Sequence, residues 1–334
     1  MIKNNILFHN VDELEETNMG LRMHRYSLEL SENVNDGARN MHRYACGCEL
    51  RFVTDAKSVK VTIYSEDAYG EILVYKGDNM HSSHRINFVG VTNFTLSDFD
   101  VFNEVNETFF NGNRFSKNVW RVYFHGFRAT LIEVDTFGYD IRPPKAEEMP
   151  KKTILSYGSS ISHGASTMVH SNAYAQTFAR LNGMDCLIKG TGGSCYLDKV
   201  VADDFAKRDD WDIALLELGI NMANPKFSKE VFDERFNYFA DTMINTGKKL
   251  IFVTIFTCSL NYTNGENSEK MKAYNEIIRK KYEKMDKTQC LLIEGTDILT
   301  NPSWLMCDCI HPSTEGHMMM GINLYNKVLE QNFI

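Results

Sequence analysis

The first 140 residues alternate between apolar and polar positions in short runs. These runs are CELRFVTD (48–55), SVKVTIYSE (58–66), GEILVYKGD (70–78), INFVGVTNFTL (86–96) and NVWRVYFHGFRATLIEVDTFG (118–138). Alternation with a period of two predicts β-strands with one buried face. Many short strands, with no long helical pattern between them, predict an antiparallel β-sandwich or jelly roll.

A segment rich in proline and charge follows this β region. Residues 139–152 (YDIRPPKAEEMPKK) contain three of the six prolines of the chain. Such a composition is typical of a linker between domains, and a long loop inside one domain is the alternative. We therefore expect a sandwich domain over residues 1–142, a linker over 143–152 and a second domain over 153–334.

In the second half, strand-like runs alternate with helical ones. The expected strands are 153–158, 185–191, 211–221, 248–256 and 290–299, and the expected helices are 172–183, 194–208, 229–247, 268–285 and 313–331. Strands that alternate with helices predict an α/β domain, a three-layer doubly wound parallel sheet with helices on both faces. Sheets of this kind place their active sites at the carboxyl ends of the strands.

Composition and net charge indicate which kinds of binding partner and which cellular compartment to expect. The 36 basic and 44 acidic residues give a net charge of −8, which argues against nucleic acid or an anionic membrane as a partner. No stretch approaches eighteen unbroken apolar residues, and the N-terminus turns acidic without a signal-peptide core. We therefore expect a cytoplasmic protein, in which the eight cysteines are reduced.

Four turns at predicted strand ends, or before the last helix, carry groups with chemistry. They are GSSIS (158–162), KGTGGSC (189–195), LGINMAN (218–224) and CDCIHPS (307–313). A serine hydroxyl needs a base to become a nucleophile, and His311 can be that base, with Asp308 fixing its tautomer. The backbone N–H groups of Ser160 and Gly193 and the amide of Asn221 can donate to an oxyanion. This set of groups predicts an acyl-transfer site.

These four blocks, in this order, resemble the SGNH (GDSL-type) hydrolase superfamily over residues 150–334. The resemblance makes Ser160 the nucleophile, with Ser159 where the family usually has Asp and with Ile161 and Ser162 completing the first block. It places the second-block glycine on Gly193 rather than Gly190, and Gly192 stands where a serine is usual. The third block falls on 219–221 and the last on 308–312. It implies a flavodoxin-like sheet order for the second domain.

A β-sandwich ahead of such a domain is similar to carbohydrate esterase family two. The sequences GCELRF (47–52) and YDIRPP (139–144) look like that group. The resemblance implies a serine esterase that removes acetyl or other short acyl groups from carbohydrates, without a cofactor. The expected partner is a small-molecule or oligosaccharide ester, and the oligomeric state is left open.

The same residues are also compatible with other roles. Ser160 can be a helix N-cap. Cys307, Cys309, His311 and His317 suggest a metal, but the C-x-C spacing is tighter than a zinc knuckle and no second ligand pair fits, so we expect none. The whole protein can be a lipase or thioesterase for longer acyl chains, or a carbohydrate-binding protein without activity. Four aromatic residues can line a sugar site or fill the core: Trp120, Tyr123, His125 and Trp304.

Overall fold

The computed structural model describes residues 1–334, and the chain forms two compact units. The first comprises Met1–Leu28 and His42–Lys151, and the second Glu29–Met41 and Lys152–Ile334. The segment 29–41 lies within the range expected for the sandwich but groups with the second unit. It carries two short helices that the β pattern did not predict, α1 (Leu28–Glu32) and α2 (Asp36–His42).

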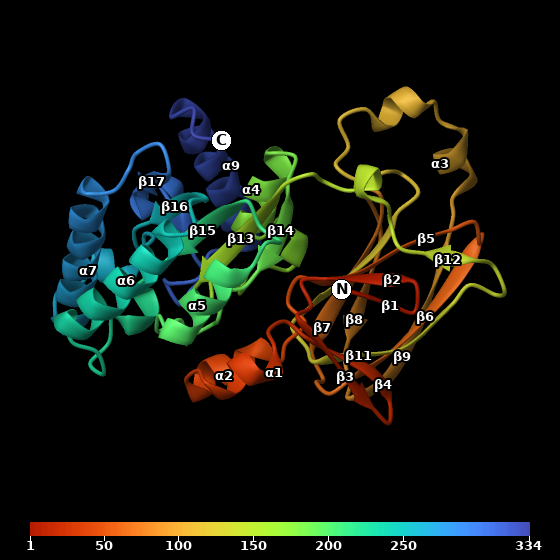
Figure 1. Ribbon diagram of the computed structural model, residues 1–334, viewed down its shortest axis with the longest axis horizontal. Coiled ribbons are helices and arrows are strands. Elements are labelled where there is room, and N and C mark those ends of the chain that lie inside the picture. Colours follow the sequence, from red (N-terminus) through yellow and green to blue (C-terminus); the bar gives the residue numbers. More distant parts are fainter. The chain divides into compact units, whose positions relative to one another are not determined.

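The first unit consists of two antiparallel sheets (Figure 1). One sheet has the order β1 (Ile2–Lys3), β2 (Ile6–His9), β5 (Cys48–Thr54), β10 (Trp120–His125), β7 (Gly70–Lys76) and β8 (Asn79–Ile86), with β12 (Ile141–Arg142) also on β5. The other has the order β3 (Glu13–Thr17), β4 (Gly20–His24), β11 (Ala129–Asp135), β6 (Ser58–Ser65) and β9 (Gly90–Ser97). One short helix, α3 (Asp100–Glu104), lies between β9 and β10. The expected antiparallel β architecture is therefore present.

Two of the expected strands are each divided by a glycine turn. The run 118–138 splits into β10 and β11 at Gly126, whose φ of +82° reverses the chain. The run 86–96 splits between β8 and β9, and β9 begins at Gly90 with φ +148°. Glycine adopts these positive φ values without the steric cost of a Cβ.

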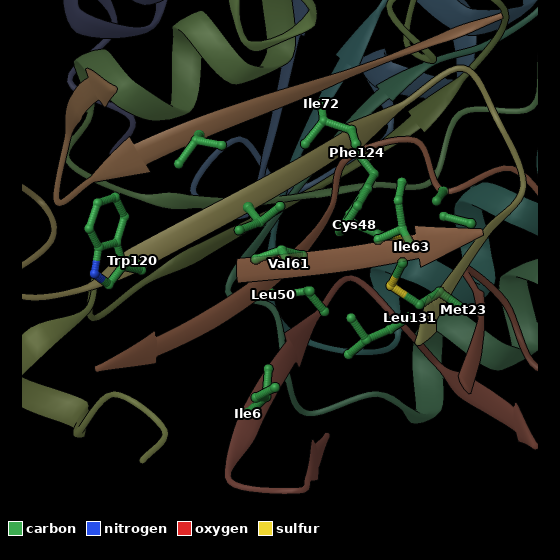
Figure 2. Packing of buried hydrophobic residues seen from close by; sticks show 14 of the residues in the cluster. Ile6, Met23, Cys48, Leu50, Val61, Ile63, Ile72, Trp120, Phe124 and Leu131 are labelled. Carbon is green, nitrogen blue, oxygen red and sulfur yellow. The ribbon is translucent and has the colours of Figure 1, made fainter. Parts of the chain in front are cut away.

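The core of the first unit lies between its two sheets. Strand β6 alternates strictly, with Val59, Val61 and Ile63 fully buried and the residues between them partly exposed. Figure 2 shows side chains from both sheets in one cluster, with Trp120 at one end of it. The pattern of period two thus directs one face of each sheet inward, as the sequence predicts.

Strand β5 departs from alternation because both of its faces are covered. Glu49, on its second face, accepts hydrogen bonds from Arg51 at 2.6 Å and from Arg121 at 2.7 Å, and all three are buried. The Arg121 guanidinium lies 4.0 Å from the ring centroid of Phe115. Burial acts to raise the pKa of Glu49, but the two arginines hold it well below its usual range.

The second unit is built on a five-stranded parallel sheet. Its order is β14 (Asp185–Ile188), β13 (Thr153–Gly158), β15 (Ile213–Glu217), β16 (Lys249–Val253) and β17 (Cys290–Ile293). The order 2-1-3-4-5 is that of flavodoxin-like sheets, whose ligands bind where the direction of winding reverses. Here the reversal is at β13, because β14 lies on one side of it and β15 on the other.

Helices cover both faces of this sheet (Figure 1). Helices α4 (Tyr174–Leu181) and α9 (Thr314–Glu330) pack on each other, and α5 (Lys199–Lys207), α6 (Lys229–Ile244) and α7 (Glu266–Glu283) form a second group; α8 (Gly295–Ile298) contacts α9. None of the helices is long and apolar enough to pass through a bilayer.

Local sequence explains the ends of the long helices. Ser228 caps α6 by accepting the N–H of Val231 at 3.3 Å, and Ser313 caps α9 by accepting the N–H of Gly316 at 3.1 Å. Gly247, with φ +70°, follows the end of α6.

Two expected elements are shorter than the sequence suggested. Residues 290–299 contain β17 and then α8, rather than one strand. The helix expected from residue 194 begins only at Lys199. Leu197 has a φ of +55°, and Ser194 and Asp198 bind Asn35 of the 29–41 segment, so long-range contacts hold 194–198 out of a helix.

Candidate active site

The structure brings Ser160 and His311 into direct contact. Strand β13 ends at Gly158, and the chain turns at once so that Ser160 lies at the carboxyl edge of the sheet. Its Oγ is 2.8 Å from Nε2 of His311, although 151 positions separate the two residues. Ser160 is partly exposed, and the His311 side chain is 27% exposed, so a ligand can reach both.

Asp308 holds His311 through both of its oxygens. Its Oδ2 is 2.7 Å from Nδ1 of His311, while its Oδ1 accepts the backbone N–H groups of Ile310 (2.9 Å) and His311 (3.0 Å). Burial acts to raise the pKa of Asp308, but these hydrogen bonds outweigh it and hold the pKa below its usual value. An ionised carboxylate can only accept a hydrogen bond, here from Nδ1–H, so the lone pair of the neutral ring is on Nε2, toward Ser160.

Three of the predicted oxyanion donors have no acceptor within the chain. The N–H of Ser160 and the N–H of Gly193 make no intramolecular hydrogen bond. Asn221 lies just beyond β15, after Gly219 turns the chain with φ +123°. Its Oδ1 accepts the N–H of Cys195 at 3.1 Å, which identifies the other end of the amide as the NH₂ group, and this group also remains available to donate.

The glycine loop 190–193 packs against the turn that carries Ser160. A Cβ on Gly190 would lie 2.4 Å from the N of His163, so only glycine fits there. A Cβ on Gly192 would lie 3.6 Å from Cβ of Ser160, whereas a Cβ on Gly193 would meet nothing within 4 Å. Gly192 therefore faces the Ser160 side chain, and Gly193, with φ +69°, presents its N–H in open space.

Sequence reasoning missed Glu217, the last residue of β15. Its side chain is fully buried, and Oε2 accepts the N–H (2.8 Å) and the hydroxyl (2.7 Å) of Ser159 and the hydroxyl of Ser162 (3.2 Å). Burial raises the pKa of Glu217 to about 7, against the opposing effect of these hydrogen bonds. A charged residue at the end of an otherwise apolar run, IALLELG, was the available signal, because parallel strands are buried on both faces.

Sequence reasoning also missed the 29–41 segment as part of this site. Asn35 anchors it, since its Nδ2 donates to Asp198 Oδ2 at 2.7 Å and to the Ser194 carbonyl at 3.1 Å. At the end of the segment, the Sδ of Met41 lies 3.6 Å from the position that a Cβ on Gly192 would take. The Cβ of Ser160 is also 3.6 Å from that position, so Met41 and Ser160 lie close together beside Gly192.

The residues suggested as metal ligands or as the lining of a sugar site have other surroundings in the structure. Both ring nitrogens of His311 are occupied, and those of His317 contact the Ala165 carbonyl and the Tyr174 N–H. Cys307 and Cys309 are exposed. In the first unit, Trp120 and Tyr123 are core residues, 1% exposed, and His125 is partly exposed. Trp304, in the second unit, is also partly exposed.

These contacts provide the groups for acyl transfer. The Ser160 hydroxyl is hydrogen-bonded to the ring nitrogen that carries the lone pair, a carboxylate fixes that ring, and donors without acceptors lie on adjoining loops. Ser160 and Asn221 follow β13 and β15, Gly193 follows β14, and Asp308 and His311 lie in the turn before α9. They meet at the carboxyl edge of the sheet, where the winding reverses.

Comparison with known proteins gives one family and several similar folds. Residues 156–319 match the model of the GDSL-like Lipase/Acylhydrolase family. No curated protein matches the chain significantly. A salicylyl-acyltransferase from a tetracycline biosynthetic pathway is similar in structure, with a TM-score of 0.79 and 13% identity over 99% of this chain and 96% of its own.

Two family two carbohydrate esterases have similar folds. The enzyme from Clostridium thermocellum, in complex with cellohexaose, has a TM-score of 0.64 and 11% identity over 98% of this chain and 100% of its own. The enzyme from Cellvibrio japonicus has a TM-score of 0.62 and 12% identity over 98% and 96%. At these identities the likeness concerns the fold.

Proposed function

Since the chain carries a domain of the GDSL-like lipase/acylhydrolase family and is an ester hydrolase, we propose that it is a serine esterase that removes short acyl groups, acetyl above all, from carbohydrates. The observation that carries this proposal is the pair of short hydrogen bonds through one imidazole. His311 is 2.8 Å from the Ser160 hydroxyl on one side and 2.7 Å from the Asp308 carboxylate on the other.

In the first half-reaction, Ser160 attacks the ester carbonyl. Its proton passes to Nε2 of His311 as the bond from Oγ to the carbonyl carbon forms, and Asp308 stabilises the resulting imidazolium. The negative charge moves onto the carbonyl oxygen. The N–H groups of Ser160 and Gly193 and the NH₂ of Asn221 stabilise it by donating hydrogen bonds. His311 then gives the proton to the leaving alcohol as the carbon–oxygen bond of the ester breaks.

In the second half-reaction, water attacks the acyl-enzyme. His311 accepts a proton from the water and returns one to Ser160 Oγ as the acid product leaves. Every proton is transferred through His311, so the chemistry requires no cofactor.

A carbohydrate substrate is supported by the two-unit architecture. The similarity to the family two carbohydrate esterases extends over nearly the whole chain, including the antiparallel β unit. One of those structures holds a cellohexaose, and an acetylated sugar is the substrate class we assign to this chain by analogy.

A short acyl group is supported by the place of Met41. Its Sδ and the Cβ of Ser160 each lie 3.6 Å from the position that a Cβ on Gly192 would take, so we infer that Met41 limits the space beside the acyl group on Ser160. Met41→Ala should therefore extend activity from acetate toward butyrate and hexanoate esters, whereas Met80→Ala, at a half-exposed methionine of the first unit, should leave the profile unchanged. An unaltered chain-length profile in Met41→Ala would remove this support.

The test of the proposed function is hydrolysis of a panel of acetylated mono- and oligosaccharides and of a chromogenic acetate. Ser160→Ala and His311→Ala should lower kcat by roughly 10⁴- to 10⁶-fold, while Ser303→Ala, at an exposed serine, should not. Acetate hydrolysis that survives unchanged in Ser160→Ala would refute the assignment.

The alternative functions give different results in the same assays. A carbohydrate-binding protein without activity would not react with a fluorophosphonate probe at Ser160. A lipase or thioesterase would prefer long acyl chains in the wild type. Both outcomes would contradict a short-chain esterase.

A further inference from the structure

Glu217 directs a buried carboxylate at the turn that carries the nucleophile. Three donors converge on a single oxygen, Oε2, and all three belong to Ser159 and Ser162, on either side of Ser160. The other oxygen, Oε1, is buried without a hydrogen-bond partner. A buried carboxylate is costly unless hydrogen bonds or a countercharge compensate it, and here every hydrogen bond that it accepts comes from this one turn.

The same contacts determine which backbone N–H groups of the turn are occupied. Glu217 accepts hydrogen bonds from both the N–H and the hydroxyl of Ser159. The hydroxyl oxygen of Ser159 in turn accepts the N–H of Ile161 at 3.1 Å. The N–H groups on both sides of Ser160 are thus occupied, while that of Ser160 is not. The one N–H that remains is the one needed by the oxyanion.

The absence of a side chain at position 158 makes room for the Glu217 carboxylate. A Cβ on Gly158 would lie 2.6 Å from Oε2 of Glu217, 2.4 Å from its carbonyl oxygen and 2.5 Å from the Ser162 hydroxyl. Glycine at position 158 is therefore what lets the carboxylate reach across from β15 to the turn after β13. The hydroxyl of Tyr174, 2.8 Å from the Ser162 oxygen, extends the network on its far side.

We propose that Glu217 is a positioning residue for catalysis: through Ser159 it fixes the Ser160 turn, so that Oγ faces His311 and the Ser160 N–H is presented to the oxyanion. This inference rests on the proposed function, because it concerns the same nucleophile. Glu217 contacts neither Ser160 nor substrate, and it acts only through the residues beside Ser160.

The network also explains how a neutral residue can stand at position 159. In the first block that this chain resembles, an aspartate is usual there, and here the carboxylate comes from the neighbouring strand instead. A second carboxylate at 159 would face Glu217 inside the protein and would repel it. An aspartate at 159 and an amide at 217 together restore one negative charge and a donor–acceptor pair.

The experiment compares four proteins: wild type, Glu217→Gln, Ser159→Asp and the double variant Ser159→Asp/Glu217→Gln. Each is assayed for kcat and KM on a chromogenic acetate, for its rate of fluorophosphonate labelling, and for thermal unfolding. Glu294→Gln is the matched control, because Glu294 follows another parallel strand, β17, and binds Thr254 and Arg279, neither of which is in the Ser160 turn.

If the inference holds, each single variant should lower kcat and the labelling rate by roughly 10- to 100-fold with KM little changed, since small displacements of reacting groups cost about this much. The double variant should recover to within a few-fold of wild type, and Glu294→Gln should match wild type. A purely structural role for Glu217 would change the unfolding temperature of folded Glu217→Gln but leave its kcat and labelling rate at wild-type values, which would overturn the inference.

Failure of the double variant to recover above the single variants would also overturn it. A wild type that neither hydrolyses the ester nor labels would instead refute the proposed function, together with the inference that rests on it.

Discussion

Replacement of Asp308 by asparagine should be more harmful than replacement by alanine. The carboxylate uses both oxygens as acceptors, Oδ1 for two backbone N–H groups and Oδ2 for Nδ1 of His311. An asparagine has one acceptor and one donor end, so it cannot satisfy both sides at once.

In Asp308→Asn, the hydrogen-bond partners of the side chain determine the orientation of its amide. With its oxygen toward the two backbone N–H groups, its NH₂ faces Nδ1 and places the ring proton on Nε2, where it cannot accept the Ser160 proton. The opposite orientation sets the NH₂ against two N–H donors, at a cost of about 1–3 kcal/mol. The productive orientation should then be populated in roughly one molecule in 10 to 100.

Loss of the negative charge adds to this effect, although the Asp308 side chain is 46% exposed and water screens part of it. We expect Asp308→Asn to lower kcat by about 10²- to 10³-fold. In Asp308→Ala, a water can accept a hydrogen bond from Nδ1–H and no amide misdirects the ring, so the loss should be smaller than in Asp308→Asn.

The assay is kcat on a chromogenic acetate, with ¹⁵N NMR of His311 to identify the protonated ring nitrogen. Asp209→Asn, at an exposed carboxylate, is the control. Wild-type kcat in Asp308→Asn, or a lower kcat in Asp308→Ala than in Asp308→Asn, would show that Asp308 does not set the tautomer.

Three further predictions concern other residues of the second unit. Asn221→Ala removes one oxyanion donor and should lower kcat by about 10²- to 10³-fold, while KM changes little; an unchanged kcat would exclude this role. Gly190→Ala forces a Cβ to within 2.4 Å of the His163 nitrogen, so it should lower the unfolding temperature and kcat together, whereas an active variant of wild-type stability would contradict the packing. Burial raises the pKa of Glu217 to about 7 from an ordinary 4.5, so the native chain holds a proton between these pH values that the unfolded chain releases. The contribution of Glu217 to the free energy of unfolding should therefore fall by about 3 kcal/mol as the pH rises through this window. It is measured as the difference between wild type and Glu217→Gln, because buried His317, whose pKa is lowered to about 4, acts in the opposite direction in both proteins. The neighbouring Tyr174, Cys195 and Cys258 do not titrate there, because burial raises their pKa values as well; denaturant unfolding at pH 4.5, 6 and 8 that gave parallel curves for the two proteins would refute the pKa.

The sequence by itself indicated the antiparallel β unit, the parallel α/β unit and the residues of the candidate site. Hydrophobic period indicates sheet or helix locally, and a parallel sheet gathers the carboxyl ends of its strands whatever their distance along the chain. That rule suffices to predict that Ser160 and His311 meet. It works because each group lies in a turn next to a strongly patterned strand or helix.

Only the tertiary structure decided how that edge of the sheet is supported. Glu217 looks like an interruption of a buried strand until β13 and β15 pair in register and bring it to Ser159, 58 positions away. Met41 lies in a segment whose own pattern gives no sign of the second unit, and long-range contacts such as the hydrogen bonds of Asn35 place it there. Contacts of this kind depend on side-chain packing between segments that are distant in the sequence. The spacing of apolar residues within one strand or helix does not indicate them.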